Sequence, residues 1–196
     1  MNTSLIECPI LDRMERAVQK VRDRLLRATS ALDAAGIPYA VIGGNAVGSW
    51  VARVDESWVR NTQDVDLLVR RCDFESFKEV LESAGFRYRH AASIDMFLDG
   101  AHAKARDAIH VIFANEKVRD EYVEPAPDVE PFETAPPYRI LALESLVRMK
   151  LTSNRDKDRT HVRDMIAVGL IDATWPDRLH PVLAERLRGM LETPNG

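Results

Sequence analysis

Apolar residues recur at steps of three and four near the start of the chain. They form the stripe Leu11, Met14, Val18, Val21, Leu25, Ala28 and Leu32. This spacing predicts an amphipathic helix over about residues 11–35, which Gly36 and Pro38 end. We expect this helix to pack over a sheet; a partner helix or a dimer contact is the alternative use of the same stripe.

Residues 39–69 follow a strand, glycine turn, helix, loop, strand pattern. Tyr39–Ile42 is a short apolar run, Gly43 and Gly44 follow it, and Ala46, Val47, Trp50, Val51 and Val54 recur at helical spacing. The second strand covers Asp64–Val69. The remaining chain is organised around this unit.

Further strands and helices are predicted on the carboxyl-terminal side of this unit. A helix with Asp73 as N-cap presents Phe74, Phe77, Val80, Leu81 and Ala84 and ends at Gly85. Strands are expected at Phe86–His90, Ile94–Leu98 and Ala108–Phe113. Residues 122–138 hold five of the ten prolines and no basic residue, which is typical of an extended connector.

The carboxyl-terminal region is predicted to be helical. One helix begins near Leu141, a second carries Val162, Met165 and Ile166, and a last one near 178–191 uses Leu179, Val182, Leu183, Leu187 and Leu191. The fold class is therefore α/β (α+β), a small mixed sheet flanked by helices. Residues 1–121 form its core, 122–139 the connector and 140–196 a helical portion packed on the core.

Composition adds limits on size, location and partners. The chain has 196 residues, 45% of them hydrophobic and 30% charged, enough for one substantial core. No run approaches the ~18 apolar residues of a membrane span, and the start lacks a signal-peptide pattern, so we expect a cytoplasmic protein with reduced cysteines. The net charge of −4 argues against a general nucleic-acid coat. Zinc spacings, a P-loop and a GxSxG motif are missing from the sequence.

The candidate chemistry begins with Asp64 and Asp66, two residues apart in the second strand of the central unit. Alternate residues of a strand point to the same side, so the two carboxylates project together, away from Val65 and Leu67. Neighbouring carboxylates resist burial as ions unless solvent or a cation compensates them. Mg²⁺, which prefers oxygen ligands, would satisfy both.

The glycine pair adds a place for phosphate. Gly43 and Gly44 open a helix, where bare backbone N–H groups and the positive end of the helix dipole suit an anion. Taken singly, a diglycine is usually a tight turn and two alternate aspartates are often a solvated strand end. Their order within one unit, with Arg60 and Thr62 just before the acids, predicts a site for a metal-bound nucleoside triphosphate (NTP).

These residues together resemble the core of the nucleotidyltransferase superfamily, which has the fold of DNA polymerase beta. The likeness is to its minimal bacterial branch, which includes abortive-infection toxin-like proteins. That branch carries a glycine pair, a helix, an arginine, a threonine or serine and an acid-x-acid strand. The matching residues are Gly43, Gly44, Arg60, Thr62, Asp64 and Asp66, with Asn45 in place of a common small residue and a longer loop before the acids.

His110 is the departure from this pattern. The resemblance implies a third acid on the strand at residues 108–113, acting as a base or a metal ligand, and His110 stands there. A neutral imidazole can take a proton or bind a softer metal such as Mn²⁺, but it does not supply a carboxylate charge to Mg²⁺. A structural histidine is the alternative, with Asp95, Asp99 or Asp107 as substitute acids.

A second signature lies in residues 146–163, where six Lys or Arg and two Asp give a local charge of +4. A charge run of this kind is usually a solvated helix surface. Its wording resembles the second motif of the same branch, with Lys150, Arg155, Lys157 and Asp158 at the matching positions. The resemblance implies that Lys150 points toward the triphosphate and that the others shape the site. His161 stands where the branch often has a further acid.

These observations predict transfer of a nucleotidyl group from an NTP to a hydroxyl acceptor. Asp64, Asp66, His110 and Lys150 are the catalytic candidates; the glycine pair, Asn45, Arg60, Thr62, Lys150, Arg155, Lys157 and Asp158 are the nucleotide-binding candidates. The cofactor is Mg²⁺ or Mn²⁺, and the acceptor is a tRNA, a protein or a small molecule. The alternatives are a degenerate nucleotide- or partner-binding protein, and a toxin with an antitoxin partner and the +4 segment facing RNA. An aminoglycoside-modifying enzyme fits less well, because the sequence offers no dedicated acidic pocket for a polycationic drug.

Overall fold

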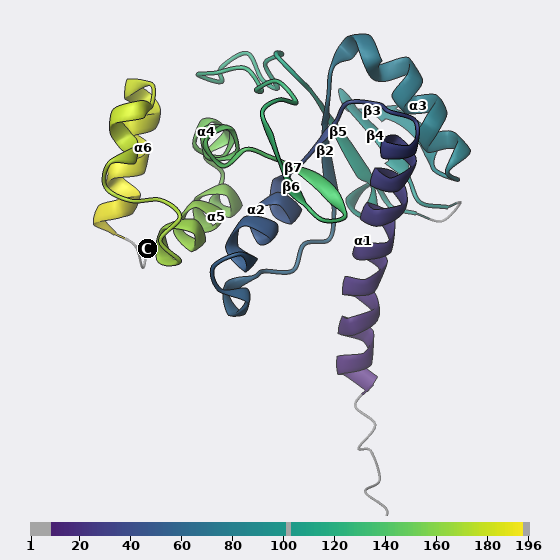
Figure 1. Ribbon diagram of the computed structural model, residues 1–196, viewed down its shortest axis with the longest axis horizontal. Helices are drawn as coiled ribbons and strands as arrows, with labels where there is room; N and C mark the ends of the chain where they lie inside the picture. The colour runs from purple at the N-terminus through teal and green to yellow at the C-terminus, as the bar shows by residue number, and fades with distance from the viewer. Residues whose placement is uncertain (1–8, 101–102, 194–196) are drawn as a thin grey trace, which may run out of the picture.

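The structure is a computed structural model that describes residues 9–100 and 103–193 (Figure 1). In this described part, seven strands form one mixed sheet in the order β3-β4-β5-β2-β1-β7-β6. The strands are β1 (Ala40–Ile42), β2 (Val65–Val69), β3 (Arg87–Ala91), β4 (Ile94–Leu98), β5 (Ile109–Phe113), β6 (Phe132–Ala135) and β7 (Tyr138–Leu141). The α-helices are α1 (Pro9–Ala34), α2 (Gly43–Ala52), α3 (Phe74–Ser83), α4 (Leu143–Ser153), α5 (Asp156–Ala167) and α6 (Pro181–Glu192). The predicted fold class is confirmed.

Strand β2 is the centre of the sheet and sets the geometry of the candidate site. It pairs antiparallel with β1 and parallel with β5, and the register places Asp66 beside Ile42 on one side and His110 on the other. Residues paired across neighbouring strands project to the same face. The sheet itself therefore carries Asp66 and His110 onto one face, next to the point where β1 gives way to α2.

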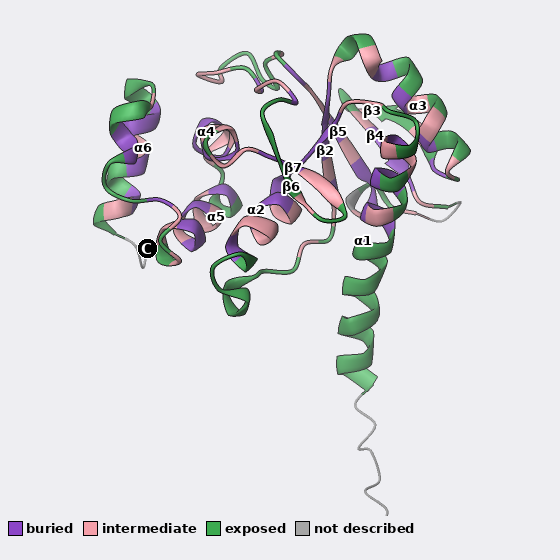
Figure 2. Ribbon diagram, in the orientation of Figure 1, coloured by how far each residue is buried: buried purple, intermediate pink, exposed green. Residues whose placement is uncertain are grey.

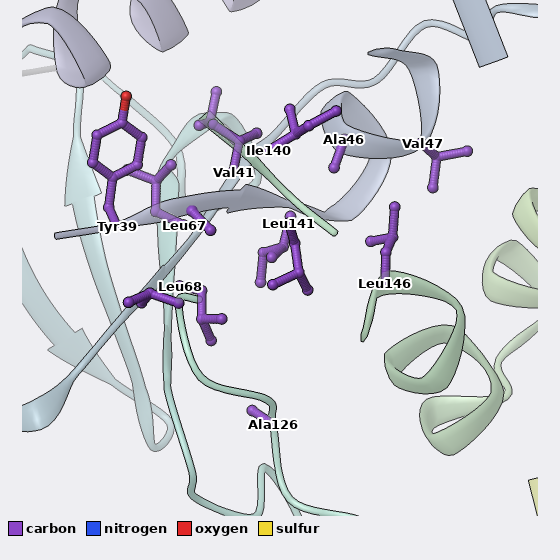
Figure 3. Packing of buried hydrophobic residues seen from close by; sticks show 14 of the residues in the cluster. Tyr39, Val41, Ala46, Val47, Leu67, Leu68, Ala126, Ile140, Leu141 and Leu146 are labelled. Atoms are coloured by element: carbon purple, nitrogen blue, oxygen red, sulfur yellow. The ribbon is translucent and has the colours of Figure 1, made fainter. Parts of the chain in front are cut away.

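The core anchors these central strands. Figure 3 shows buried side chains of β1, β2 and β7 packed together with residues of α2 and α4. They include Val41, Ala46, Leu67, Leu68, Ile140, Leu141 and Leu146. Val65 and Leu67, which alternate with the two aspartates, are both 0% exposed. The backbone that presents the acids is therefore fixed by close packing.

Helix α1 packs on the body of the protein only through its second half. Leu25, Ala28 and Leu32 are buried, whereas Leu11 and Met14 are exposed (Figure 2). At 1.5 Å per residue the helix is about 39 Å long, and its first half extends beyond the sheet (Figure 1). The expectation that the whole stripe packs over the sheet is wrong for this first half.

The proline-rich segment is part of the sheet. Residues 122–139 were expected to be an extended connector, but β6 lies within this range and β7 begins in it at Tyr138 and ends at Leu141, and the two strands form an antiparallel hairpin. Strand β7 then pairs parallel with β1 through Val41 and Ile140. The hairpin thus extends the sheet from β1 and leads directly into α4.

Asp73 is the N-cap residue of α3, as predicted, although its side chain makes no capping hydrogen bond. Two other local expectations are wrong. Val54 lies beyond the end of α2 and is exposed. On α6, Val182 is exposed, and Met190 is buried with Leu183 and Leu187. Within the described residues, the helices are too short or too polar to cross a bilayer.

Candidate active site

Three partly buried side chains converge beside the end of β1. Asp64 lies directly before β2, Asp66 lies on β2, and His110 lies on β5. The Nδ1 atom of His110 is 3.5 Å from Oδ1 of Asp66 and 4.0 Å from Oδ2 of Asp64. One ligand atom from each residue lies within 4.8 Å of the other two. The structure thus joins the predicted acid pair and the predicted histidine in one cluster.

Asp64 is held from both its backbone and its side chain. Thr62 Oγ1 donates a hydrogen bond to Oδ1 of Asp64 at 2.7 Å, and Asn45 Nδ2 donates to the Asp64 carbonyl oxygen at 2.9 Å. Thr62 binds one carboxylate oxygen of Asp64, and the other oxygen faces His110. Thr62 and Asn45, both predicted to bind nucleotide, therefore orient an acid in this structure.

The glycine pair gives room to protein side chains. Gly43 has φ +68°, and a Cβ atom built on it would lie 1.9 Å from Oδ2 of Asp66. A Cβ on Gly44 would lie 3.0 Å from Oγ1 of Thr62. The space on the Cβ side of each Cα is filled by an acid and by the threonine that orients the other acid. Glycine is needed at residue 43 both for its backbone angle and for this contact.

His110 is oriented by the turn that precedes β5. Its Nε2 atom donates a hydrogen bond to the carbonyl oxygen of Ala105 at 2.9 Å. The hydrogen bond to Asp66 raises the pKa of His110, against the opposing effect of burial. Burial would raise the pKa of Asp66, but the hydrogen bond with His110 and the charge of Lys150 bring it below its ordinary value. The cluster therefore favours an ionised Asp66.

The predicted basic residues of the second signature divide into Lys150, which is buried, and Arg155 and Lys157, whose side chains are 54% and 53% exposed. Lys150 is 6% exposed, and its Nζ lies 3.1 Å from Asp158, which is 0% exposed. Arg155 Nε and Ser153 Oγ each donate to the same carboxylate at 2.7 Å. Against the cost of burial, the hydrogen bond from Arg155 and the charge of Lys150 hold the pKa of Asp158 far below its usual range. The Lys150–Asp158 pair is thus a buried structural unit near Asp66.

Lys157 is the exposed lysine of the signature. Its side chain is 53% exposed, and its Nζ lies 3.9 Å from Oδ2 of Asp64. A lysine on a flexible stem at this distance can turn from the acid to an incoming phosphate. In the structure, Lys157 is thus an exposed cation beside Asp64, whereas Lys150 is buried.

Arg60 binds another acid. Its guanidinium donates to Asp164 through Nε at 2.6 Å and Nη2 at 3.0 Å, which fixes the loop before β2 to α5. With Gly44 and His161, these two residues line a small cavity. Burial and the charge of Lys150 lower the pKa of His161 to about 4, and its Nδ1 has no hydrogen-bond partner among the described residues. Arg60 therefore contacts Asp164 and not the cluster of Asp64, Asp66 and His110.

Sequence reasoning missed Asp164, Ser153 and the Ala105 carbonyl. A signal existed for Asp164, since an acid next to Met165 interrupts the apolar face of a helix. The suggestion that Asp95 or Asp99 substitutes for the third acid is wrong. Asp95 accepts hydrogen bonds from Tyr88 at 2.6 Å and His90 at 2.9 Å, and Asp99 pairs with Arg24 and Arg27.

The fold and the cluster together define a nucleotidyltransferase-type protein, and comparison of sequences agrees. A family model described as an uncharacterised nucleotidyltransferase matches residues 10–144, more than half of the chain. The chain belongs to this family. A comparison with curated proteins finds no match.

Solved structures share the fold. An antigenic nucleotidyltransferase-like protein from Paracoccidioides brasiliensis is 18% identical, with a TM-score of 0.56 and 90% of each chain covered. The antibiotic-resistance factor ANT(2'')-Ia in solution is 14% identical, with a TM-score of 0.53 over 90% of this chain and 93% of that one. Its crystal structure with adenylyl-2''-tobramycin gives 15% identity and a TM-score of 0.52 over 87% and 98%.

Proposed function

We propose that the protein transfers a nucleoside monophosphate from an NTP to a hydroxyl acceptor. The observation that carries this proposal is the convergence of Asp64, Asp66 and His110 on one face, beside the start of α2. Two carboxylates and an imidazole offer oxygen and nitrogen donors suited to a divalent cation. The donor set therefore fits the metal that this class of enzyme uses.

The residues have separable roles in this proposal. Asp64 and Asp66 would hold the cation, with Thr62 and Gly43 keeping their carboxylates in place. Lys157 lies at the open side to meet the triphosphate. The buried Lys150 adds positive potential near Asp66.

The proposed reaction is a displacement at the α-phosphorus of the NTP. The acceptor oxygen forms a bond to the α-phosphorus, the bond from that phosphorus to the α,β-bridging oxygen breaks, and pyrophosphate and a proton are released. The bound cation supplies charge stabilisation to the phosphate oxygens. The chain itself contributes positioning and a fixed electrostatic environment, which account for most of catalysis in phosphoryl chemistry.

A second candidate is a nucleotide-binding protein that has lost transfer, and the observation behind it is His110 at the position of the third acid. The structure gives the toxin alternative less support, because most basic side chains of residues 146–163 contact acidic side chains. Lys150 and Arg155 contact Asp158, and Arg148 contacts Glu124. These pairs therefore leave less free basic surface for RNA to contact.

Transfer of label from α-³²P-labelled NTPs tests the proposal. The four NTPs are incubated with Mg²⁺ or Mn²⁺ and with tRNA, protein or small-molecule fractions. Aminoglycosides are included because a similarly folded protein has been captured with adenylyl-2''-tobramycin. We expect metal-dependent labelling of one acceptor class from α- but not γ-labelled NTP, and loss of it in Asp66→Ala. Metal-dependent NTP binding without transfer to any fraction supports the degenerate candidate. Equal transfer by Asp66→Ala removes the assigned site.

A further inference from the structure

His110 presents one specific nitrogen to the two aspartates. Its Nε2 atom is committed to the Ala105 carbonyl oxygen at 2.9 Å. A carbonyl oxygen only accepts hydrogen bonds, so Nε2 must carry a hydrogen. In the neutral ring the lone pair then resides on Nδ1, the atom that lies 3.5 Å from Asp66 Oδ1. The ring is thus set with Nδ1 toward the acids, where it donates a hydrogen bond to Asp66 when protonated and offers its lone pair to a metal ion when neutral.

We propose that His110 is a third metal ligand, coordinating through Nδ1, and that the site therefore favours Mn²⁺ over Mg²⁺. This inference rests on the metal site of the proposed function and deepens it. Metal-binding histidines usually donate their other ring N–H to a carbonyl or carboxylate, which fixes the tautomer and the ring orientation. The Ala105 carbonyl provides that partner.

Each of the three ligands has its own orienting contact. Thr62 occupies one oxygen of Asp64, the missing Cβ of Gly43 accommodates Asp66, and the Ala105 carbonyl orients His110. In an octahedral site with bonds of about 2.1 Å, adjacent donors are about 3 Å apart and opposite donors about 4.2 Å. The Nδ1–carboxylate distances of 3.5 and 4.0 Å are close to these spacings. Small side-chain movements suffice to close on an ion.

The identity of the third donor determines the preferred metal. Replacing a carboxylate by a neutral imidazole removes one negative charge from the site, and the small, hard Mg²⁺ ion depends most on such charge. Imidazole nitrogen binds first-row transition metals well. A ligand role also removes Nδ1 from proton transfer, so His110 does not act as the base that takes the proton of the acceptor.

Electron spin echo envelope modulation of Mn²⁺ bound to the full chain tests this proposal without nucleotide transfer. A directly bound imidazole gives a ¹⁴N coupling. We expect the coupling in the parent and in His90→Ala, which removes another histidine of the sheet, and its loss in His110→Ala and His110→Asp. Titration of Mn²⁺ should show a Kd increase of at least about tenfold in His110→Ala, since losing even an outer-shell partner costs about 10–100-fold. The His110→Asp variant should gain Mg²⁺ affinity relative to Mn²⁺.

Bound Mn²⁺ without ¹⁴N coupling, a coupling that persists in His110→Ala, or an absence of Mn²⁺ binding overturns the proposal. Circular dichroism shows whether each variant folds, and His110→Asp carries the test if His110→Ala does not. The outcome is separable from the proposed function. If the ¹⁴N coupling is seen but no nucleotide is transferred, His110 is a metal ligand and the proposed transfer is wrong. If transfer occurs with Mn²⁺ but no coupling is seen, the proposed transfer stands and the ligand role of His110 is wrong.

Discussion

Replacing Gly43 by alanine is expected to weaken metal binding by displacing a carboxylate. The new Cβ would lie 1.9 Å from Asp66 Oδ2, a separation that real Cβ atoms do not show, so the carboxylate has to retreat. A displacement of about 1 Å at a reacting group is enough to lower a reaction rate by as much as about 100-fold. The positive φ of +68° adds a backbone cost of roughly 1–2 kcal/mol to the folded state.

Gly85→Ala is the matched control. Gly85 has φ +88°, and its added Cβ would meet no described atom within 4 Å, so this variant carries the backbone cost without the collision. Urea unfolding should show a loss of about 1–2 kcal/mol in Gly85→Ala and a larger loss in Gly43→Ala, whose new Cβ would also lie 2.9 Å from the Cβ of Asp66. Calorimetric titration with Mn²⁺ should show a Kd raised about tenfold or more in Gly43→Ala only. The steric explanation is refuted if Gly43→Ala binds Mn²⁺ as tightly as the parent, or if Gly85→Ala loses as much Mn²⁺ affinity as Gly43→Ala.

Other predictions concern the buried charges. Lys150→Met should lower the free energy of unfolding by about 3 kcal/mol, because it leaves the fully buried Asp158 with less compensation; a loss below ~1 kcal/mol in urea contradicts this. Asp164→Asn should cost roughly 1–3 kcal/mol by weakening the two contacts with Arg60, and Arg60→Met should add little to it in the double variant. His161 has a pKa lowered to about 4 by burial, so the unfolded chain binds more protons and stability falls as pH drops from about 6.5 toward 4. His161→Gln should flatten this dependence by up to about 3 kcal/mol, and an unchanged slope contradicts the assignment.

The acids of the site were predictable because they follow strand periodicity. Asp64 and Asp66 alternate with Val65 and Leu67, and the register of β2 against β5 places His110 where the strand pattern indicates. The side of a strand to which a residue points can be predicted from the sequence alone, since the alternation depends only on backbone geometry.

The orienting contacts were not predictable, because they join residues distant in sequence. Asp164 binds Arg60 across 104 positions, and the Ala105 carbonyl that orients His110 carries no side-chain signal. The glycine pair was recognised, but the groups that fill its space, Asp66 and Thr62, follow from the tertiary fold.

The boundaries of burial were missed for a related reason. The stripe of α1 is continuous in sequence, yet Leu11 and Met14 extend past the sheet and remain exposed. The prolines of residues 122–138 hid the β6–β7 hairpin, since proline disfavours strands; in the structure Pro131, Pro136 and Pro137 flank β6 and β7 and do not lie within them. A repeating pattern shows which face is apolar, and only the packing partners decide how much of it is covered.

The most direct measurement is anomalous diffraction from crystals grown with Mn²⁺ and a non-hydrolysable NTP analogue. The account predicts an anomalous peak between Asp64, Asp66 and His110 Nδ1, at bonding distance of about 2.0–2.2 Å from each, with phosphate oxygens of the analogue on the same ion and Lys157 turned toward them. An analogue bound elsewhere, or a peak that contacts neither aspartate, contradicts it.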